Sequence, residues 1–576
     1  MKLKINKQII LDLTVTGLFT LLSMTVISFI IPSGLTSDFL LRGSKIVSLV
    51  FLALVSVFLI SWYFDREFQF KKKISLPKYK DFLLLFLPIS PIINYIILNT
   101  EYLNILGATY VLLVSLIFIV ILSFIIPILL SYLASFEMLM ISGLSISFTI
   151  LNMSTITENP QNHLLNSQFI TQGSYLIMTF VILYLVFKFN KISAYILVVV
   201  FFISGLTHKV YNNFFSNKFL VEQSDNRLDV FLKNSENNIK NKKNIYILIY
   251  ESYANLETLN NYGFDNSEQI KFLKDKNFKI YDGIYSNGAS SVSSTSRILE
   301  LREQLSKHGR YYISGNAFSL NVLKANGYKT VGLFNSPYFF GQYPKSWDEY
   351  YPKEDISKIG SKIILKAIFE GQFRFDIFDD NYNYDEYLDL KQKYLTSKPK
   401  QPTLFYSHNL LPGHSQNSGK CLPNEKESYF ERVKKANNEM KNDVINLRNN
   451  DPNAIVVFVS DHGPYLTKNC RELIGIKKNL INKYDIQDRY GVFLAINWSK
   501  DINNNFKNIE LSQDIFPAIF GNITSNENLF DELKLKREFF DRFNTVTGGI
   551  NIKNGVLVGG KNDGEPLFEN RSYVFE

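Results

Sequence analysis

Long apolar runs fill the first third of this 576-residue chain and stop abruptly near residue 206. A helix needs about 20 apolar residues to cross a bilayer, and runs of about that length lie at 9–31, 45–64, 82–98, 108–131, 137–153, 174–189 and 193–206. A soluble helix bundle is disfavoured, because so many successive helices would then be apolar on every face. The runs predict an α-helical transmembrane bundle over 1–206, with seven spans, or five if the last two short runs form one re-entrant hairpin.

Basic loops indicate the orientation of this bundle. The N-terminal stretch MKLKINK and the loop at 65–81 are rich in Lys and Arg, and such loops stay in the cytoplasm. The loop at 152–173 contains neither Lys nor Arg, which suits the opposite side. An odd number of spans then predicts a multi-pass protein of the inner or plasma membrane whose C-terminal part is periplasmic or extracellular. The first run is too long for a removed signal peptide and lacks its small-residue cleavage site.

The formal net charge of +9 does not indicate a nucleic-acid partner. The basic residues lie close to the predicted spans or are mixed with acidic ones, with no clustered stripe. The two cysteines, Cys421 and Cys470, are too few for a disulfide-rich scaffold, although a single disulfide between them is possible. Residues 207–243 form a polar connector, which is either a plain linker or an amphipathic helix on the membrane surface.

From residue 244 the pattern changes to short apolar runs that alternate with helical stretches. Runs rich in β-branched and aromatic residues indicate buried strands at 244–250, 329–334, 403–408, 454–460 and 491–496. The stretch 427–450 has apolar residues at helical spacing. This alternation predicts an α/β domain over 244–576 with a mainly parallel central sheet. In such sheets the reacting groups gather at the carboxyl ends of the strands.

Polar residues with catalytic potential stand at those strand ends. Glu251 follows the run at 244–250, and Asp461-His462-Gly463 follows the run at 454–460. Between them lies the hydroxyl-rich segment YSNGASSVSSTSR at 285–297. A carboxylate, an Asp-His pair and a hydroxyl at one sheet edge can converge on one divalent cation, which would acidify the hydroxyl and offset charge on a transferred group. Each feature alone is weak, because an Asp-His-Gly turn or a Ser-rich loop also occurs without function.

On these motifs the segment from about 244 to 523 resembles the sulfatase-like branch of the alkaline phosphatase superfamily. It is most similar to the membrane-anchored phosphoethanolamine and phosphoglycerol transferases, which include the lipoteichoic acid synthases. LFYSHNLLPGHS at 404–415 is similar to the family's substrate-binding His region, and LSQDIFPAIFG at 511–521 to its closing stretch. Hydrophobic helices before the domain are also the family's layout, although seven spans would be more than is usual there.

The resemblance implies a metal site and a nucleophile. Glu251, Asp461 and His462 would bind one metal ion, with Ser293 as the fourth ligand and the attacking oxygen. Two registers of the 285–297 segment, one on the transferases and one on the sulfatase signature, both point to Ser293. The neighbouring hydroxyls stay open as alternatives: Ser291, Ser294 and Thr295. Three oxygens and one imidazole suit zinc or manganese, and calcium would fit a sulfatase.

The resemblance also implies substrate contacts. His414 would be catalytic, contacting the phosphoryl oxygens or protonating the leaving group. His408 and Arg297 are further candidates for substrate binding, with a buried hydrogen-bonded histidine and a surface ion pair as the respective alternatives. Where the transferases carry an aromatic and a basic residue, this chain has Phe340 and Gln342. The missing basic residue leaves the substrate open.

The function implied is a membrane-bound, metal-dependent transferase. It would move a phosphoethanolamine or phosphoglycerol head group from a membrane phospholipid to a cell-surface glycan or lipid, through a covalent Ser intermediate. One alternative is a sulfatase that converts Ser293 to formylglycine, against which stands Thr295 in place of the signature proline. A second alternative is a catalytically silent membrane scaffold, against which stands the joint presence of the four predicted site residues.

Overall fold

The structure is a computed structural model, and two compact units are evident in it. It describes residues 12–20, 23, 74–98, 103, 105–131, 134–151, 168–218, 227–234, 238–302, 309–341, 343–353, 383–415, 421–470, 473, 476–499, 508–526, 528–534, 538–539 and 550–572. The first unit ends at Val221 and the second begins at Glu222. Residues 356–379 are the exception to this division, and they lie outside the described ranges. The division falls inside the connector predicted over 207–243.

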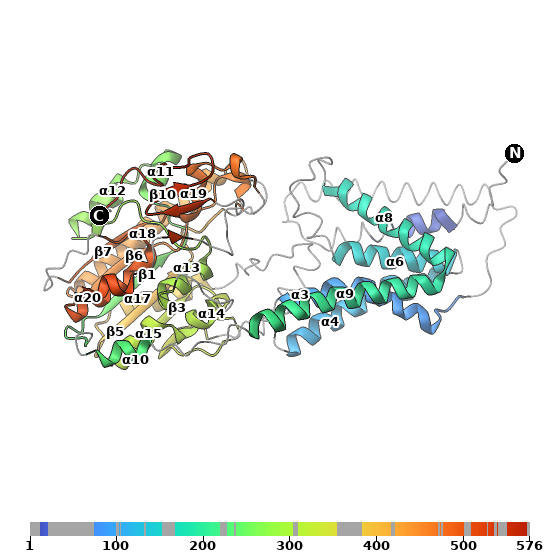
Figure 1. Ribbon diagram of the computed structural model, residues 1–576, viewed down its shortest axis with the longest axis horizontal. Coiled ribbons are helices and arrows are strands. Elements are labelled where there is room, and N and C mark those ends of the chain that lie inside the picture. The colour runs from blue at the N-terminus through green and yellow to red at the C-terminus, as the bar shows by residue number, and fades with distance from the viewer. Residues whose placement is uncertain are drawn as a thin grey trace. The chain divides into compact units, whose positions relative to one another are not determined.

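All regular elements described in the first unit are helices (Figure 1). Its elements are η2 (Tyr79–Leu85), α3 (Phe86–Leu98), α4 (Ile105–Val120), the π-helical η3 (Ile121–Ile125), α5 (Ile126–Leu130), α6 (Phe136–Leu151), α8 (Gln168–Phe189) and α9 (Lys191–Lys218). The five predicted runs from 82–98 onward coincide with these helices. The run at 45–64 and most of the run at 9–31 lie outside the described residues.

One helix in the described ranges is long and apolar enough to cross a membrane. It is Ile105–Leu130, formed by α4, η3 and α5 in succession. The other apolar helical stretches are shorter: Phe136–Leu151, Tyr175–Phe189 and Lys191–Ser204. These helices therefore support one span by length and composition, and the predicted number of spans rests on the sequence.

Burial within this unit differs sharply from helix to helix. Along α6 every side chain except that of Glu137 is buried. A Cβ added at Gly143 would lie 2.1 Å from the carbonyl oxygen of Leu122, so the two backbones approach very closely there. Helix α4 instead exposes large apolar side chains, with Ile105 and Leu106 at 86% and 80% exposure. An apolar outer surface around a tightly packed interior suits lipid better than water.

The second unit is built on a seven-stranded sheet with the order β2-β7-β6-β1-β5-β3-β4. The strands are β1 (Ile245–Tyr250), β2 (Lys279–Ile280), β3 (Lys329–Phe334), β4 (Glu349–Tyr351), β5 (Thr403–Asn409), β6 (Ile455–Val459) and β7 (Leu494–Asn497). The strands from β6 to β4 in this order pair in parallel, and β7 and β2 add antiparallel pairings at one edge. The predicted mainly parallel sheet is confirmed.

Helices cover both faces of this sheet, because alternate side chains of each buried strand point to opposite sides. Ile245, Ile247 and Ile249 of β1 belong to one core, and Tyr246 and Leu248 to the other. The first core includes residues of α13 (Ser291–Glu300), α15 (Phe318–Ala325) and α20 (Ile515–Thr524); the second includes residues of α11 (Leu256–Tyr262), α12 (Ser267–Asp275), α17 (Tyr384–Leu395) and α18 (Glu425–Asn450).

Shorter elements complete the second unit. They are α10 (Arg227–Lys233), α14 (Gly309–Tyr311), η5 (Tyr312–Asn316), η6 (Pro337–Phe339), η7 (Lys468–Cys470), η8 (Lys478–Leu480), α19 (Lys483–Tyr490), η9 (Ser512–Asp514), α21 (Asn528–Leu533), and an antiparallel sheet of β8 (Glu538–Phe539), β9 (Asn551–Lys553) and β10 (Val556–Val558). The connector contributes α10, whose Phe231 is buried against Phe318. The last part of the connector is therefore built into the second unit.

Candidate active site

Three strands of the central sheet end side by side. Tyr250 at the end of β1 pairs with Asn409 at the end of β5, and Ile249 pairs with Val459 at the end of β6. Glu251 follows β1 directly, and its amide donates to the Asn409 carbonyl at 3.3 Å. The predicted carboxylate ligand and the Asp-His pair therefore emerge from adjacent strands at the same edge.

Asp461 is fully buried and its two oxygens have different surroundings. Oδ1 accepts from the amides of Ser252 and His462, each at 2.9 Å. Oδ2 lies 3.4 Å from His408 Nε2 and 3.5 Å from His462 Nε2, but no donor in the described part of the chain is aligned for a hydrogen bond to it. Burial by itself would raise the pKa of Asp461, but the His462 and His408 rings and the Ser252 amide outweigh it and hold this pKa well below its usual range.

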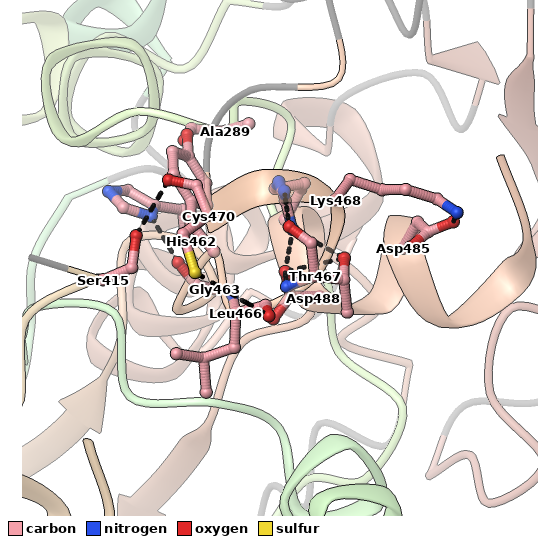
Figure 2. Close-up of polar contacts among 12 residues, drawn as sticks. Ala289, Ser415, His462, Gly463, Leu466, Thr467, Lys468, Cys470, Asp485 and Asp488 are labelled. Carbon is pink, nitrogen blue, oxygen red and sulfur yellow. Dashed lines mark hydrogen bonds and ion pairs between the residues drawn. The ribbon is translucent and has the colours of Figure 1, made fainter. Parts of the chain in front are cut away.

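His462 is oriented by the backbone that follows it. Its Nδ1 lies 2.8 Å from the carbonyl oxygen of Gly463 (Figure 2) and 3.2 Å from Ser252 Oγ. Because a carbonyl oxygen only accepts, Nδ1 carries the proton and Nε2 keeps its lone pair. Burial lowers the pKa of His462, which favours this neutral form. The free lone pair points to Ser291, whose Oγ lies 3.2 Å from Nε2.

The hydroxyl that reaches His462 belongs to the first residue of α13. Ser290 precedes the helix with an extended backbone, and the helix begins at Ser291. Ser293, the residue predicted to be the nucleophile, lies two positions further, and residues two apart on a helix do not share a face. Arg297 is buried and donates to the carbonyl oxygen of Ser293 at 3.0 Å and also to its Oγ. The structure thus brings Ser291 to His462, and Ser293 to Arg297.

The remaining hydroxyls of this segment also face away from His462 or are enclosed. Ser294 Oγ accepts from Ser286 Oγ at 2.8 Å, and Thr295 is fully buried. The Gly288 backbone covers Ser293, because a Cβ added at Gly288 would lie 2.7 Å from Ser293 Oγ. The sequence could have indicated Ser291 only through the position at which α13 begins. The 285–297 segment contains several residues at which a helix could begin, so this position was not evident.

His414 lies beside His462, as the resemblance predicted for a residue of the same site. Their ring centroids are 6.2 Å apart. His414 Nδ1 lies 2.8 Å from the carbonyl oxygen of Ser415, so Nδ1 carries a proton and Nε2 is the ring atom left for chemistry. Arg432 holds the backbone here by donating to the carbonyl oxygens of Pro412 at 2.7 Å and His414 at 3.1 Å.

His408 and Phe340 are placed differently from the substrate contacts considered above. His408 is fully buried, with its ring 4.3 Å from that of Phe339 and its Nε2 next to Asp461. Phe340 is buried in the core against Phe334. Neither side chain is open to a substrate in this arrangement, and Gln342 lies outside the described residues.

Tyr465 was not among the residues singled out from the sequence. Its ring lies 5.3 Å from that of His462 and 5.7 Å from that of His414, measured between centroids. Its hydroxyl donates to the carbonyl oxygen of Ala289, in the hydroxyl-rich segment. Tyr465 therefore joins the two histidines to the backbone that leads to Ser291. A lone tyrosine after an Asp-His-Gly turn carries no signal for this role.

The loop that carries Tyr465 is fastened to Asp488 of α19. One carboxylate oxygen accepts from the amide of Leu466 at 3.0 Å, and the other from the amide of Thr467 at 3.2 Å (Figure 2). A Cβ added at Gly463 would lie 2.2 Å from the carbonyl oxygen of Asp488. Only glycine fits this approach, so the third residue of the Asp-His-Gly motif is required by packing.

A disulfide joins the segments that carry the two histidines. Cys421 and Cys470 are bonded, with 5.0 Å between their Cα atoms. Two hydrogen bonds lie beside it: the Ser415 amide donates to the Pro464 carbonyl at 2.8 Å, and Ser415 Oγ donates to the Cys470 carbonyl at 3.0 Å. The disulfide that the sequence left open is therefore formed. Disulfides persist in oxidising compartments.

The ligand set predicted from the sequence is only partly assembled. Within the described ranges, no three His, Cys, Asp or Glu side chains stand where together they would hold a metal ion. The contacts that do exist are those of His462 with Ser291 and of Asp461 with two imidazole rings. A hydroxyl next to an imidazole lone pair, beside a buried carboxylate, can serve nucleophilic chemistry.

Of three comparisons with known proteins, the one with solved structures found matches. No family model and no curated protein matches it. Among solved structures, it matches the integral membrane lipooligosaccharide phosphoethanolamine transferase A from Neisseria meningitidis with 13% identity and a TM-score of 0.35, over 77% of this chain and 94% of that one.

Two further solved structures match about half of this chain. The C-terminal periplasmic domain of EptC from Escherichia coli matches with 15% identity and a TM-score of 0.32, over 48% of this chain and 81% of that one. The lipoteichoic acid synthase LtaP from Listeria monocytogenes matches with 15% identity and a TM-score of 0.33, over 52% and 77%. These are the kinds of protein that the motifs resemble. Because the TM-scores lie below 0.5, the function proposed below rests on the residues of the site.

Proposed function

We propose that this chain is a membrane-bound, metal-dependent transferase. It moves a phosphoethanolamine or phosphoglycerol head group from a membrane phospholipid to a glycan or lipid at the cell surface. The observation that carries the proposal is the contact of Ser291 Oγ with the unprotonated Nε2 of His462, next to the buried Asp461 carboxylate. The nucleophile is accordingly Ser291, with Ser293 as the alternative that the sequence favoured.

A divalent cation fits the residues present. Among the described residues, no well-aligned donor meets the buried Asp461 Oδ2, which is costly for an ionised oxygen unless a cation offsets it. The separations of His462 Nε2 from Ser291 Oγ, 3.2 Å, and from Asp461 Oδ2, 3.5 Å, are close to the spacing of about 3.3 Å between neighbouring ligands of a tetrahedral zinc ion.

The ion would be held by Glu251, Asp461, His462 and the Ser291 oxygen. This set of three oxygens and one imidazole suits zinc or manganese, and calcium less well. Such an ion, when bound, acidifies the serine hydroxyl and offsets the negative charge on the phosphoryl oxygens. His408, buried behind Asp461, supports the carboxylate.

The chain's own residues carry the transfer in two steps. In the first, the Ser291 oxygen, whose proton has already passed to solvent, forms a bond to phosphorus while the bond from phosphorus to the diacylglycerol oxygen breaks, and His414 gives its Nε2 proton to that leaving oxygen. In the second, Nε2 of His414 takes the proton of the acceptor hydroxyl, whose oxygen bonds to phosphorus as the bond to Ser291 breaks. Arg432 keeps His414 in place for both steps through its two carbonyl contacts.

A membrane anchor suits a lipid donor, because enzyme and substrate then share one surface. The apolar helix Ile105–Leu130 and the outward apolar side chains of the first unit support this anchor. The Cys421–Cys470 disulfide supports a periplasmic or extracellular position for the second unit.

The test uses the purified full-length protein in vesicles that contain a phospholipid with a labelled head group. We expect release of diacylglycerol, a stoichiometric divalent metal, and a Ser291 peptide heavier by the phosphorylated head group. A formylglycine at Ser293 together with hydrolysis of an aryl sulfate would establish the sulfatase instead. Absence of both activities from a metal-loaded protein would favour the silent scaffold.

A further inference from the structure

Helix α18 and its neighbour α17 bury a cluster of charged side chains in the second unit. Lys391 and Asp443 are 1% and 0% exposed, and Lys391 Nζ lies 3.0 Å from Asp443 Oδ2. The same Nζ lies 3.5 Å from Glu439 Oε2, which is partly buried. Apolar residues of similar size often serve stability as well as a buried ion cluster does. The cluster therefore invites a role other than stability.

The two acids of the cluster contact two neighbours of Glu251, one before it in the chain and one on the adjacent strand β5. Asp443 Oδ2 accepts from the hydroxyl of Tyr250, the residue before Glu251, at 2.8 Å. Glu439 Oε2 accepts from the side-chain amide of Asn409 at 2.7 Å. The carbonyl oxygen of Asn409 in turn accepts from the Glu251 amide. The backbone of Glu251 is thus tied to both acids through one intermediate residue each.

The same helix also holds the far end of the loop that carries His414. Arg432 donates to the carbonyl oxygens of Pro412 and His414, while the amide of Gly413 donates to the carbonyl oxygen of Glu251 at 2.9 Å. Loop 409–415 is therefore fixed at one end by Glu439 and at the other by an arginine seven residues earlier on α18.

The sequence spacing of its polar residues explains how α18 contacts both ends of the 409–415 loop. Arg432, Glu439 and Asp443 are separated by seven and four residues, which places them on one face of an α-helix. Tyr384 of α17 adds a shared donor, because its hydroxyl contacts Asn409 Oδ1 and lies 3.0 Å from Glu439 Oε1. The polar face of α18 is therefore directed at the loop and at the strand end before Glu251.

We infer that Lys391, Glu439 and Asp443 are positioning residues, which hold Glu251 and the 409–415 loop in the geometry that the site requires. The inference rests on the proposed function for the reaction that it serves. None of the three reaches the reacting groups: they act through Tyr250 and Asn409.

The decisive experiment replaces the cluster by apolar residues in the full-length protein, as Lys391→Met, Glu439→Leu and Asp443→Leu together. Buried ion clusters replaced in this way commonly keep the fold or make it more stable. We expect a protein that stays folded with a somewhat lower melting temperature, because Tyr250 and Asn409 lose buried acceptors. We also expect a kcat for head-group release that is about 10- to 100-fold lower, and an unchanged KM. Amide hydrogen exchange in the 409–415 peptide should become faster.

Controls and contrary outcomes separate this inference from the proposed function. Glu431→Leu removes an acid of the same helix that is 67% exposed and should change neither kcat nor exchange in the loop. If the wild-type protein releases no head group but the triple variant still exchanges faster than wild type in the 409–415 peptide, the transferase is refuted and the positioning role stays intact. A folded triple variant with wild-type exchange and kcat would overturn the positioning role. If the triple variant does not fold, Glu439→Gln decides by the same exchange measurement, and an unchanged rate overturns it.

Discussion

Asp461 and His462 are each held in one orientation by several contacts, whereas residues 290–295 offer several neighbouring hydroxyls whose partners differ from one to the next. Two amides fix Oδ1 of Asp461, and a carbonyl fixes Nδ1 of His462. On the other side of the site, Ser291 and Ser293 differ mainly in their direction from the axis of α13. The proposed ligands follow from strand ends, which can be recognised in a sequence, while the proposed nucleophile depends on the residue at which a helix begins.

The largest effect is expected from the Asp-His side. His462→Ala removes the imidazole that both contacts Ser291 and lies beside Asp461, so metal binding and head-group release should both fall by about 1,000-fold or more. The domain should stay folded, because a core of this size does not depend on one ion. Metal content, circular dichroism and the lipid assay check this. Full metal occupancy in the variant would exclude His462 as a ligand.

A slightly smaller effect distinguishes the two serines. Ser291→Ala should reduce head-group release by about 1,000-fold, because the covalent route is lost, while Ser293→Ala should retain activity within about tenfold. Each variant is assayed with the same labelled lipid, and the modified peptide is identified by its mass. A larger loss of activity in Ser293→Ala than in Ser291→Ala would identify Ser293 as the nucleophile, and the position at which α13 begins would then not decide it.

Removing the Cys421–Cys470 disulfide, which lies near His414 and His462, should lower the stability of the protein. The double variant Cys421→Ser and Cys470→Ser opens a link between residues 49 apart, for which chain entropy predicts a loss of about 4 kcal/mol in the free energy of unfolding. Urea unfolding of the full-length protein with and without reductant measures it. Equal midpoints for the variant and the oxidised wild type would mean that the segments are held without the bond.

The smallest effect is expected from the hydrogen bond of Tyr465 to the Ala289 carbonyl, which joins the Asp-His loop to the hydroxyl-rich segment. Tyr465→Phe keeps the ring between the histidines and removes the hydrogen bond to the Ala289 carbonyl, worth about 1 kcal/mol. We expect a fall in kcat of up to about tenfold with little change in KM. Steady-state kinetics checks this, with Tyr484→Phe, an exposed tyrosine of α19, as the matched control. A change in KM alone would assign Tyr465 to substrate binding.

The strands that carry the site were predictable because each is a continuous run of β-branched and aromatic residues with a polar residue directly after it. The short strands β2 and β4 were not, since two or three residues carry no pattern. Helix α9 continues to Lys218 because residues 206–218 contain no proline or glycine to end it, although its polarity changes. Tyr465 and the charged face of α18 escaped prediction because their roles depend on contacts between segments far apart in the chain.

The close approach of Gly463 to the Asp488 carbonyl has a consequence for reading other sequences. An Asp-His pair that merely caps a turn places no demand on the residue after it. Here the backbone passes so near α19 that any side chain at position 463 would push the loop away and carry His462 with it. The glycine therefore discriminates between an incidental pair and one that is built into a site, and a search that scores it should separate the two without any knowledge of the reaction.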